Sequence, residues 1–332
     1  MQRRIGTVTL VIVGVALIAG TLAFQMFSRA PAFERMTNDF AKNVTPATVA
    51  ALRADVAKLQ AAGTELQTTG IPALARLLKM TPAQFAAFAQ QQFPTLAASV
   101  QQIPQTAAGF DKQLGVIAAQ DAHLRSAVAI PAKSISTTAV PWLILAAGVV
   151  IAGLGMARAR ITSMVAVAVG ALVIIGVFAF SLPSKTSDAD ALNKAMKPYF
   201  NQQQIDASSR SITSLNALSD ELGGKVLNAI SAAQHVPVSQ LIGPFASQFP
   251  ALASALTSLP QATDRANALA ATFERNLANY NKVAPFHFES ATWVLLAAGL
   301  LVMIGGALPL LVSDEKDSSE HGQRWFRRAA AA

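Results

Sequence analysis

The sequence predicts an all-α membrane protein with four transmembrane helices in two tandem parallel repeats, each with an extracytoplasmic helical bundle between its two spans. Of its 332 residues, 52% are hydrophobic and only 13% are charged, whereas a typical soluble domain has about 25% charged residues. The apolar residues gather in a few long stretches, and the two halves of the chain align with each other. These three observations together indicate the fold class.

The spans are predicted from four stretches that contain no Asp, Glu, Lys, Arg or His. Each is close to the roughly 20 apolar residues that a helix needs to cross the hydrocarbon core of a bilayer. We therefore expect transmembrane helices, surrounded by the lipid bilayer, over residues 5–27, 140–156, 161–182 and 292–312.

The two long segments between the spans, residues 28–139 and 183–291, carry helix signals and no strand alternation. Thr45-Pro46 and Thr81-Pro82 are typical helix starts, with threonine as N-cap and proline as the first helical residue. Glycine and proline residues, Pro104 among them, are expected to divide the pattern into short helices. Each long segment is therefore predicted to form its own compact helical bundle.

Arginines beside the short segments predict the orientation in the membrane. The positive-inside rule counts Lys and Arg in short loops close to the ends of the spans. The N-terminus (1–4), the link (157–160) and the tail (313–332) all carry them, at Arg3, Arg4, Arg158, Arg160, Arg324, Arg327 and Arg328. Both termini and the link are therefore expected in the cytoplasm, and the long segments outside a plasma (inner) membrane.

One constant register aligns the first half of the chain with the second and predicts a tandem duplication. It pairs Arg4-Ile5 with Arg160-Ile161 and Glu65-Leu66 with Glu221-Leu222. The second copy is slightly shorter near its end, where Trp142 pairs with Trp293. We call two residues superposed in this way a register pair. Each copy enters and leaves the membrane, so the copies run in the same direction.

The duplication also bears on a competing interpretation of residues 1–30 as a cleaved signal peptide. The first span matches the third, which is internal to the chain. We therefore expect the first span to be retained as a helix.

A repeated motif is the most distinctive feature of the two long segments. It comprises Phe93, Pro94, Leu96 and Pro104 in the first copy, and Phe249, Pro250, Leu252 and Pro260 in the second. We interpret it as structural, because proline stops one helix and opens the next while phenylalanine and leucine fill a core. An apolar surface for a ligand or a partner is the alternative.

Matched glycines mark the second and fourth spans. Gly148 and Gly155 stand two helical turns apart, as do Gly299 and Gly306, so each pair lies on one face. Small residues allow helices to approach closely in lipid. These faces are expected to pack the spans together or to dock a partner.

Candidate chemistry is sparse. Cysteine is absent, which excludes disulfides, thiolate catalysis and cysteine metal sites. No histidines stand at i, i+4, and the sequence has no Gly-x-Ser-x-Gly, phosphate-binding glycine loop or His-Glu-x-x-His motif. We expect no catalytic, cofactor-binding or metal-binding residue and no enzyme activity. His287, just before the last span, is interpreted as an interfacial anchor, with pH sensing or lipid-headgroup contact as the alternative.

The partners expected from the sequence follow from this elimination. The net charge of +8 is not concentrated in one stripe, which argues against a nucleic-acid partner, and the uncharged spans argue against an ion-coupled pump. Our hypothesis is a non-catalytic accessory or scaffold subunit of a bacterial cell-envelope membrane complex, with other membrane proteins or further copies of the chain as partners. The alternatives are a carrier or transporter component for lipids or other hydrophobic molecules, with a lipid ligand, and a ligand sensor that signals through a separate partner.

Overall fold

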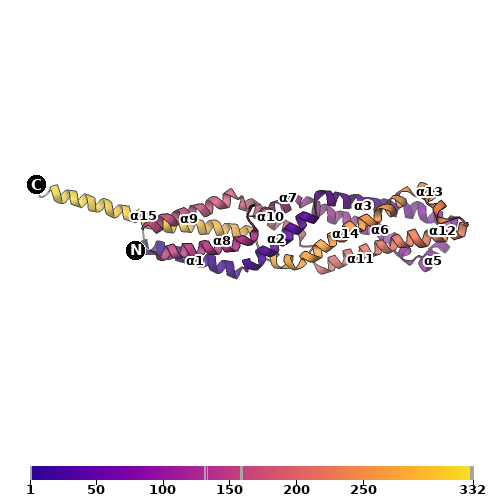
Figure 1. Cartoon of the computed structure of the whole chain (residues 1–332), viewed down its shortest axis with the longest axis horizontal. Helices are drawn as coiled ribbons and strands as arrows, with labels where there is room; N and C mark the ends of the chain where they lie inside the picture. The colour runs from indigo at the N-terminus through magenta and orange to yellow at the C-terminus, as the bar shows by residue number, and fades with distance from the viewer. Residues whose placement is uncertain (1, 131, 133, 158–159, 330–332) are drawn as a thin grey trace. The chain divides into compact units, whose positions relative to one another are not determined.

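The computed structural model describes residues 2–130, 132, 134–157 and 160–329, and these are almost entirely helical, with no strand among them (Figure 1). An isolated antiparallel bridge joins Ala132 and Ile135. The elements are α1 (Gln2–Ala23), α2 (Met26–Asn43), α3 (Pro46–Glu65), η1 (Leu66–Gly70), α4 (Ile71–Leu77), α5 (Pro82–Gln92), α6 (Pro94–Ala119), α7 (Asp121–Val128), η2 (Thr137–Ala139), α8 (Val140–Met156), α9 (Arg160–Ala179), α10 (Leu182–Met196), α11 (Gln202–Asp220), η3 (Glu221–Val226), α12 (Leu227–Gln234), α13 (Val238–Gln248), α14 (Pro250–Val283) and α15 (Phe288–Ala329).

The chain divides into two compact units. The first, the span unit, comprises Met1–Asn38, His123–Lys194 and Ala278–Ala332, and the second, the distal unit, comprises Asp39–Ala122 and Ala195–Leu277. Residues 158 and 159 of the predicted link, residue 1 of the predicted N-terminus and residues 330–332 of the predicted tail lie outside the described residues.

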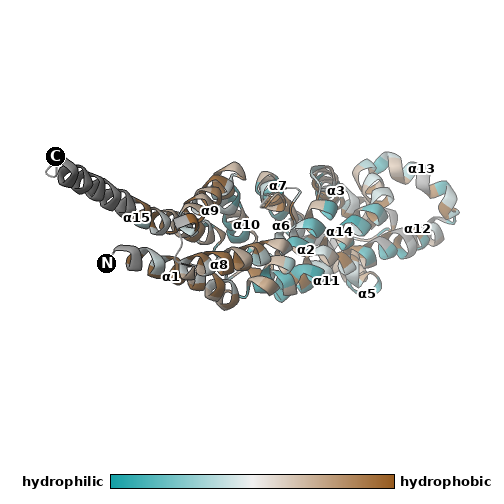
Figure 2. Cartoon of the chain, turned by 60° about the vertical axis from the view of Figure 1, so that its left-hand side comes forward, coloured by the Kyte–Doolittle hydropathy of each residue, from teal (hydrophilic) through white to brown (hydrophobic). Residues whose placement is uncertain are grey.

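Four helices of the span unit are long and apolar enough to cross a membrane, which confirms the prediction of four candidate spans. They cover Ile5–Ala23, Thr137–Met156, Ile161–Ala179 and Phe288–Leu310. Figure 2 shows the hydrophobic colouring that dominates α1, α8 and α9. Large apolar side chains remain exposed on their outer faces, such as Ile12 at 61% and Leu172 at 67%, as expected for side chains that contact lipid.

The spans pack in a closed arrangement. α1 lies against α8 and α15, and α9 lies against α15 and α8. Small and branched side chains fill the centre, namely Leu10, Val13, Ile151, Ala166, Ala298 and Val302. The four helices therefore bury a common core within the membrane-spanning part of the chain.

The first and third spans end earlier than the sequence suggested, at Ala23 and Ala179 rather than at residues 27 and 182. The reason is a left-handed residue two positions after the end of each helix, Gln25 with φ 51° and Ser181 with φ 52°. A left-handed backbone interrupts the helical hydrogen-bond ladder. Gln25 and Ser181 are a register pair, so the two turns lie at equivalent positions of the alignment.

Acidic side chains cap the second and fourth spans. The Glu34 carboxylate on α2 accepts a hydrogen bond from the Thr138 backbone N–H at 2.9 Å, and the Asp190 carboxylate on α10 accepts one from the Glu289 N–H at 2.9 Å. Negative charge at a helix N-terminus satisfies orphan donors and complements the helix dipole. Burial by itself raises the pKa of Glu34, but hydrogen bonds from Ser136 and Thr138 outweigh it and lower the pKa below its usual value.

The distal unit differs from the expectation of a separate bundle in each long segment. Its helices come from both segments and share one core, in which Leu66 and Leu96 of the first segment join Leu222 and Leu252 of the second. An amphipathic helix must bury its apolar face against another element. Here each segment buries those faces against the other, an outcome of long-range packing that local periodicity does not reveal.

The predicted helix starts in the first segment are confirmed. Thr45 accepts a hydrogen bond from the Thr48 backbone N–H at 3.1 Å as N-cap of α3. Thr81 forms a capping box with Gln84 at the start of α5. These starts rest on local chemistry, which is why the sequence alone predicts them.

Candidate functional site

The repeated Phe-Pro motif lies at equivalent helix junctions of the distal unit. Phe93 ends α5 with φ −133° and ψ 60°, and Pro94 begins α6. Phe249 ends α13 with φ −130° and ψ 64°, and Pro250 begins α14. The side chains of Phe93, Leu96, Phe249 and Leu252 are all buried in the shared core.

The second prolines of the motif correct one expectation. Pro104 and Pro260 lie inside α6 and α14, which continue through them, so they do not divide the helices. A proline in a helix removes a hydrogen bond, but packing on both sides can hold the helix together. Ile103 and Ala107 are buried next to Pro104, and they hold α6 against the core there.

Two glutamates join the halves of the distal unit by reciprocal caps. The Glu221 carboxylate accepts a hydrogen bond from the Leu96 backbone N–H at 2.6 Å, and the Glu65 carboxylate accepts one from the Leu252 N–H at 2.7 Å. Both donors lie in the first turn of a helix, where backbone N–H groups lack helical partners. Each segment therefore completes a helix start of the other segment.

The capping glutamates stand at breaks in helical geometry. Glu65 ends α3 directly before the π-helical turn η1, and Glu221 begins the π-helical turn η3. A π turn inserts a residue into the helical repeat and changes the direction of the side chains beyond it. Glu65 and Glu221 are a register pair, but no local signal in the sequence indicates that each reaches across to the other long segment.

A buried ion pair lies on one side of the shared core. The Arg265 guanidinium on α14 donates to the Asp55 carboxylate on α3, and Asp55 is only 6% exposed. The register partners of these residues are Gly109 and Ser211, so the other copy has no such pair. Asp55 lies on the apolar stripe of Leu52, Val56 and Leu59, and an acidic residue on such a stripe is the sequence signal that could have identified it.

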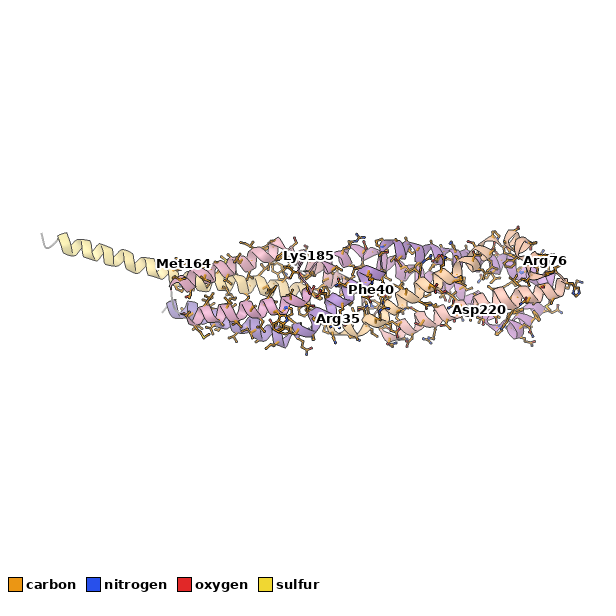
Figure 3. The ribbon with its side chains drawn as sticks, in the orientation of Figure 1. Arg35, Phe40, Arg76, Met164, Lys185 and Asp220 are labelled. Atoms are coloured by element: carbon orange, nitrogen blue, oxygen red, sulfur yellow. The ribbon has the colours of Figure 1, made fainter. Side chains whose placement is uncertain are left out.

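Aromatic rings from α2, α14 and the segment before α11 pack together. The ring of Phe40, labelled in Figure 3, lies with its centroid 5.4 Å from that of Phe200 and 5.0 Å from that of Phe273. Phe200 and Phe273 are themselves 5.0 Å apart. Such ring pairs stabilise packing beyond the area that they bury, so this cluster helps to hold the three segments together.

Cavities interrupt the packing between the two segments. A large one has a volume of about 290 Å³ and lies between α3, α6 and α11, and two smaller ones measure about 70 and 30 Å³. The Leu59 side chain lines all three. The large cavity is lined by Val56, Leu59, Gln102, Ile103, Thr106, Ala107, Phe110, Ala207, Arg210, Ser211, Ser214 and Leu215. Small-molecule sites are concave and are often formed between helices of a bundle, so this half-open cavity is the candidate binding site.

The four predicted glycines lie at close contacts between spans of the same chain. A Cβ atom on Gly148 would lie 2.9 Å from the Gly14 carbonyl oxygen, and one on Gly299 would lie 3.0 Å from Cγ1 of Ile174. A Cβ atom on Gly155 would lie 2.9 Å from Val11, and one on Gly306 would lie 2.8 Å from the backbone oxygen of Ser163. Their faces are therefore occupied by α1 and α9.

The histidines do not form a metal centre in the described part of the chain, where no three His, Cys, Asp or Glu side chains come together in a way that could hold an ion. His123 Nδ1 lies 2.8 Å from the Asp188 carboxylate, and both side chains are about one-third exposed. His287 is exposed before α15.

Comparisons of the chain with protein-family models, with curated proteins and with solved structures found no match.

Proposed function

We propose that this chain is a duplicated four-span protein of the plasma (inner) membrane, with both termini in the cytoplasm and residues 28–139 and 183–291 outside. Register pairs with matching roles support the duplication. Gln25 and Ser181 both adopt a left-handed backbone, and Glu65 and Glu221 both cap a helix of the opposite copy. Such long-range correspondence is not explained by shared composition alone.

The orientation is testable because the natural chain contains no cysteine. Single substitutions Ser258→Cys and Ala157→Cys place one thiol in the distal unit and one in the predicted link. We expect a membrane-impermeant maleimide to label Ser258→Cys in intact cells and Ala157→Cys only after permeabilisation. The opposite pattern would contradict the orientation.

In function, we propose a non-catalytic accessory or scaffold subunit of a cell-envelope membrane complex. The observation that carries this proposal is the construction of the distal unit as one body from both segments, joined by the reciprocal caps of Glu65 and Glu221. A preformed helical surface of this kind loses little conformational entropy when a partner binds.

The hydrogen bonds and ion pairs of the carboxylates also support the scaffold role. Glu34 and Asp190 cap the spans, Glu65 and Glu221 cap the distal helices, and Asp55 pairs with Arg265. Each of these groups is held by a structural partner, in contrast to an acid or base poised for proton transfer.

Purification in mild detergent tests the scaffold role. We expect the full chain to co-purify with the same membrane proteins in constant proportion, and two differently tagged copies to reveal a homo-oligomer. The double variant Glu65→Gln/Glu221→Gln should release the partners, while Glu274→Gln, an exposed change in the same unit, should retain them. A solitary monomer from the wild-type chain would contradict the proposal.

A second candidate function is a carrier or transporter component for hydrophobic molecules. It is favoured by the cavity of about 290 Å³ between α3, α6 and α11, a volume near the lower limit of small-molecule sites. Mass spectrometry of lipids bound to the purified chain tests it. Lipid-free protein, extracted under conditions that retain annular lipid, would contradict it.

A further inference from the structure

We propose that the cavity between α3, α6 and α11 binds the hydrocarbon chain of a single-chain anionic amphiphile, such as a long-chain fatty acid, with the head group held at Arg210. This assignment concerns one site of the distal unit and does not depend on the scaffold role. A scaffold, a carrier or a sensor would each use such a site differently.

The cavity walls suit a hydrocarbon chain. Val56, Ile103 and Ala107 are buried, and Leu59, Phe110 and Leu215 are half-buried around the void. The lining is not purely apolar, since Gln102, Thr106, Ser211 and Ser214 also belong to it. A cavity with both kinds of lining suits a molecule that has an apolar chain and a polar head. A volume of about 290 Å³ is small for a ligand site, which favours one chain over the two chains of a phospholipid.

The rim suits an anionic head group. Arg210 is exposed at the edge of the cavity, and its Nε donates to the backbone oxygen of Asp206 at 3.3 Å. The Asp206 carboxylate itself accepts a hydrogen bond from Gln202 at 2.7 Å. Gln102, Ser211 and Ser214 also line the cavity, and no acidic residue is in that lining set. The hydroxyls of Ser211 and Ser214 donate to the backbone oxygens of Ala207 and Arg210.

An arginine beside polar donors is a recognised arrangement for carboxylates. The planar guanidinium offers several donors that match the two oxygens of a carboxylate. The side-chain amide of Gln102 adds an uncharged donor. The combination of an apolar interior and a basic rim therefore matches an amphiphile whose head carries negative charge.

The two copies have diverged at this point, and the divergence singles out one cavity. Register partners of the large cavity's lining, Ile212, Leu259 and Ala266, line the smaller cavity of about 70 Å³. That side carries the Asp55–Arg265 ion pair. On the side of the large cavity the corresponding positions are Ser211 and Gly109.

The cationic rim is likewise confined to one copy. The register partner of Arg210 is Ala54. The larger space and the arginine therefore occur together, on the side where the ion pair is missing. This coincidence is the strongest argument that the large cavity is a site and not an accidental packing defect.

Photolabelling of the full chain in lipid nanodiscs tests the assignment. The probe is palmitic acid that carries a diazirine on its chain, and crosslinked peptides are identified by mass spectrometry. We expect labelling within residues 102–110 of α6 and residues 207–215 of α11, with palmitate as an effective competitor. Labelling confined to the four spans would overturn the proposal, because it would report annular lipid only.

Substitution of Ala107 tests the chain-binding part of the site. Ala107→Leu should place three additional carbons in the cavity and reduce labelling there about tenfold, as expected when occupied volume excludes the chain. Ala108→Leu, an exposed change one residue along the same helix, is the matched control and should label like the wild type. Equal labelling of both variants would overturn the proposal.

Substitution of Arg210 tests the head-group contact. Arg210→Gln should weaken competition by palmitate about tenfold, the loss expected for one charge-assisted hydrogen bond, and should leave competition by neutral hexadecanol unchanged. Arg76→Gln, labelled in Figure 3 and exposed on α4, is the control. Because the readout is a ratio of two competitors, a general loss of folding cannot mimic it. An unchanged ratio would overturn the role of Arg210.

Discussion

The span unit and the distal unit solve the same packing problem in opposite ways. In the span unit, glycines bring backbones into contact, as where Gly14 and Gly148 meet. In the distal unit, large side chains such as Leu66, Leu96 and Phe93 fill a core that still contains cavities. Lipid offers no hydrophobic driving force between helices, so close fit must supply the stability of the spans. In the distal unit, burial of apolar side chains from water supplies that force, so its core can be stable although it contains cavities.

This comparison predicts that added volume harms the two units unequally. Gly148→Leu should destabilise the span unit by about 3 kcal/mol, because overpacking forces neighbouring backbones apart. Gly153→Leu on the same helix is the control, since nothing lies within 4 Å of a Cβ atom at that position. Thermal unfolding of the full chain in detergent measures the difference, and equal midpoints for the two variants would break the comparison.

The buried ion pair gives the next largest expected effect. Arg265→Gln should cost about 2 kcal/mol, because it leaves the buried Asp55 carboxylate without its cation. The double variant Asp55→Ser/Arg265→Gln should cost less than the single one, because both charges are then absent. Denaturant unfolding of the four members of the cycle measures this, and a double variant less stable than the single one would refute it.

The reciprocal caps should matter somewhat less. Glu221→Gln should cost about 1.5 kcal/mol, because a charge-assisted hydrogen bond to the Leu96 N–H becomes a neutral one. Glu65→Gln should behave in the same way at Leu252, and the exposed Glu274→Gln should be neutral. Hydrogen exchange at the Leu96 and Leu252 amides provides the site-specific readout. Unchanged protection at both amides would show that the caps do not hold the halves together.

The smallest expected effect is a dependence on pH in the span unit. The folded-state pKa of Glu34 is lowered from 4.5, so its contribution to stability is complete above that value and is lost as the pH falls through the folded pKa. Melting curves in acid should therefore decline less steeply for Glu34→Gln than for the wild-type chain. Parallel curves would show that Glu34 does not stabilise the start of α8.

Local chemistry explains which features could be predicted from the sequence. The candidate spans follow from uninterrupted apolar runs, and the caps at Thr45 and Thr81 follow from residues within one helical turn. The shared core does not, because helical periodicity states which face is apolar and not what covers it. The prediction that Pro104 divides a helix was wrong for a related reason, since burial of its neighbours outweighs the local preference of proline to end a helix.

The candidate site could not be predicted from the sequence. The repeated Phe-Pro motif marks the helix junctions, whereas the cavity lies along the middle of α3, α6 and α11. Its rim residues Arg210 and Ser211 stand where the aligned positions of the first half carry Ala54 and Asp55. Such positions do not stand out when the two halves are aligned for identical residues. Only the contact between α6 and α11 in the structure brings them into one site.

The reciprocal caps also have a consequence for assembly. A molecule that carried only residues 1–156 would hold Glu65 and the Leu96 amide but neither of their partners. Its nearest source of both would be a second identical molecule, placed about a twofold axis so that each glutamate reaches the other's helix. Such an isologous contact is the commonest form of symmetric dimer. The half-chain is therefore expected to behave as a homodimer that reproduces both capping contacts of the full-length chain.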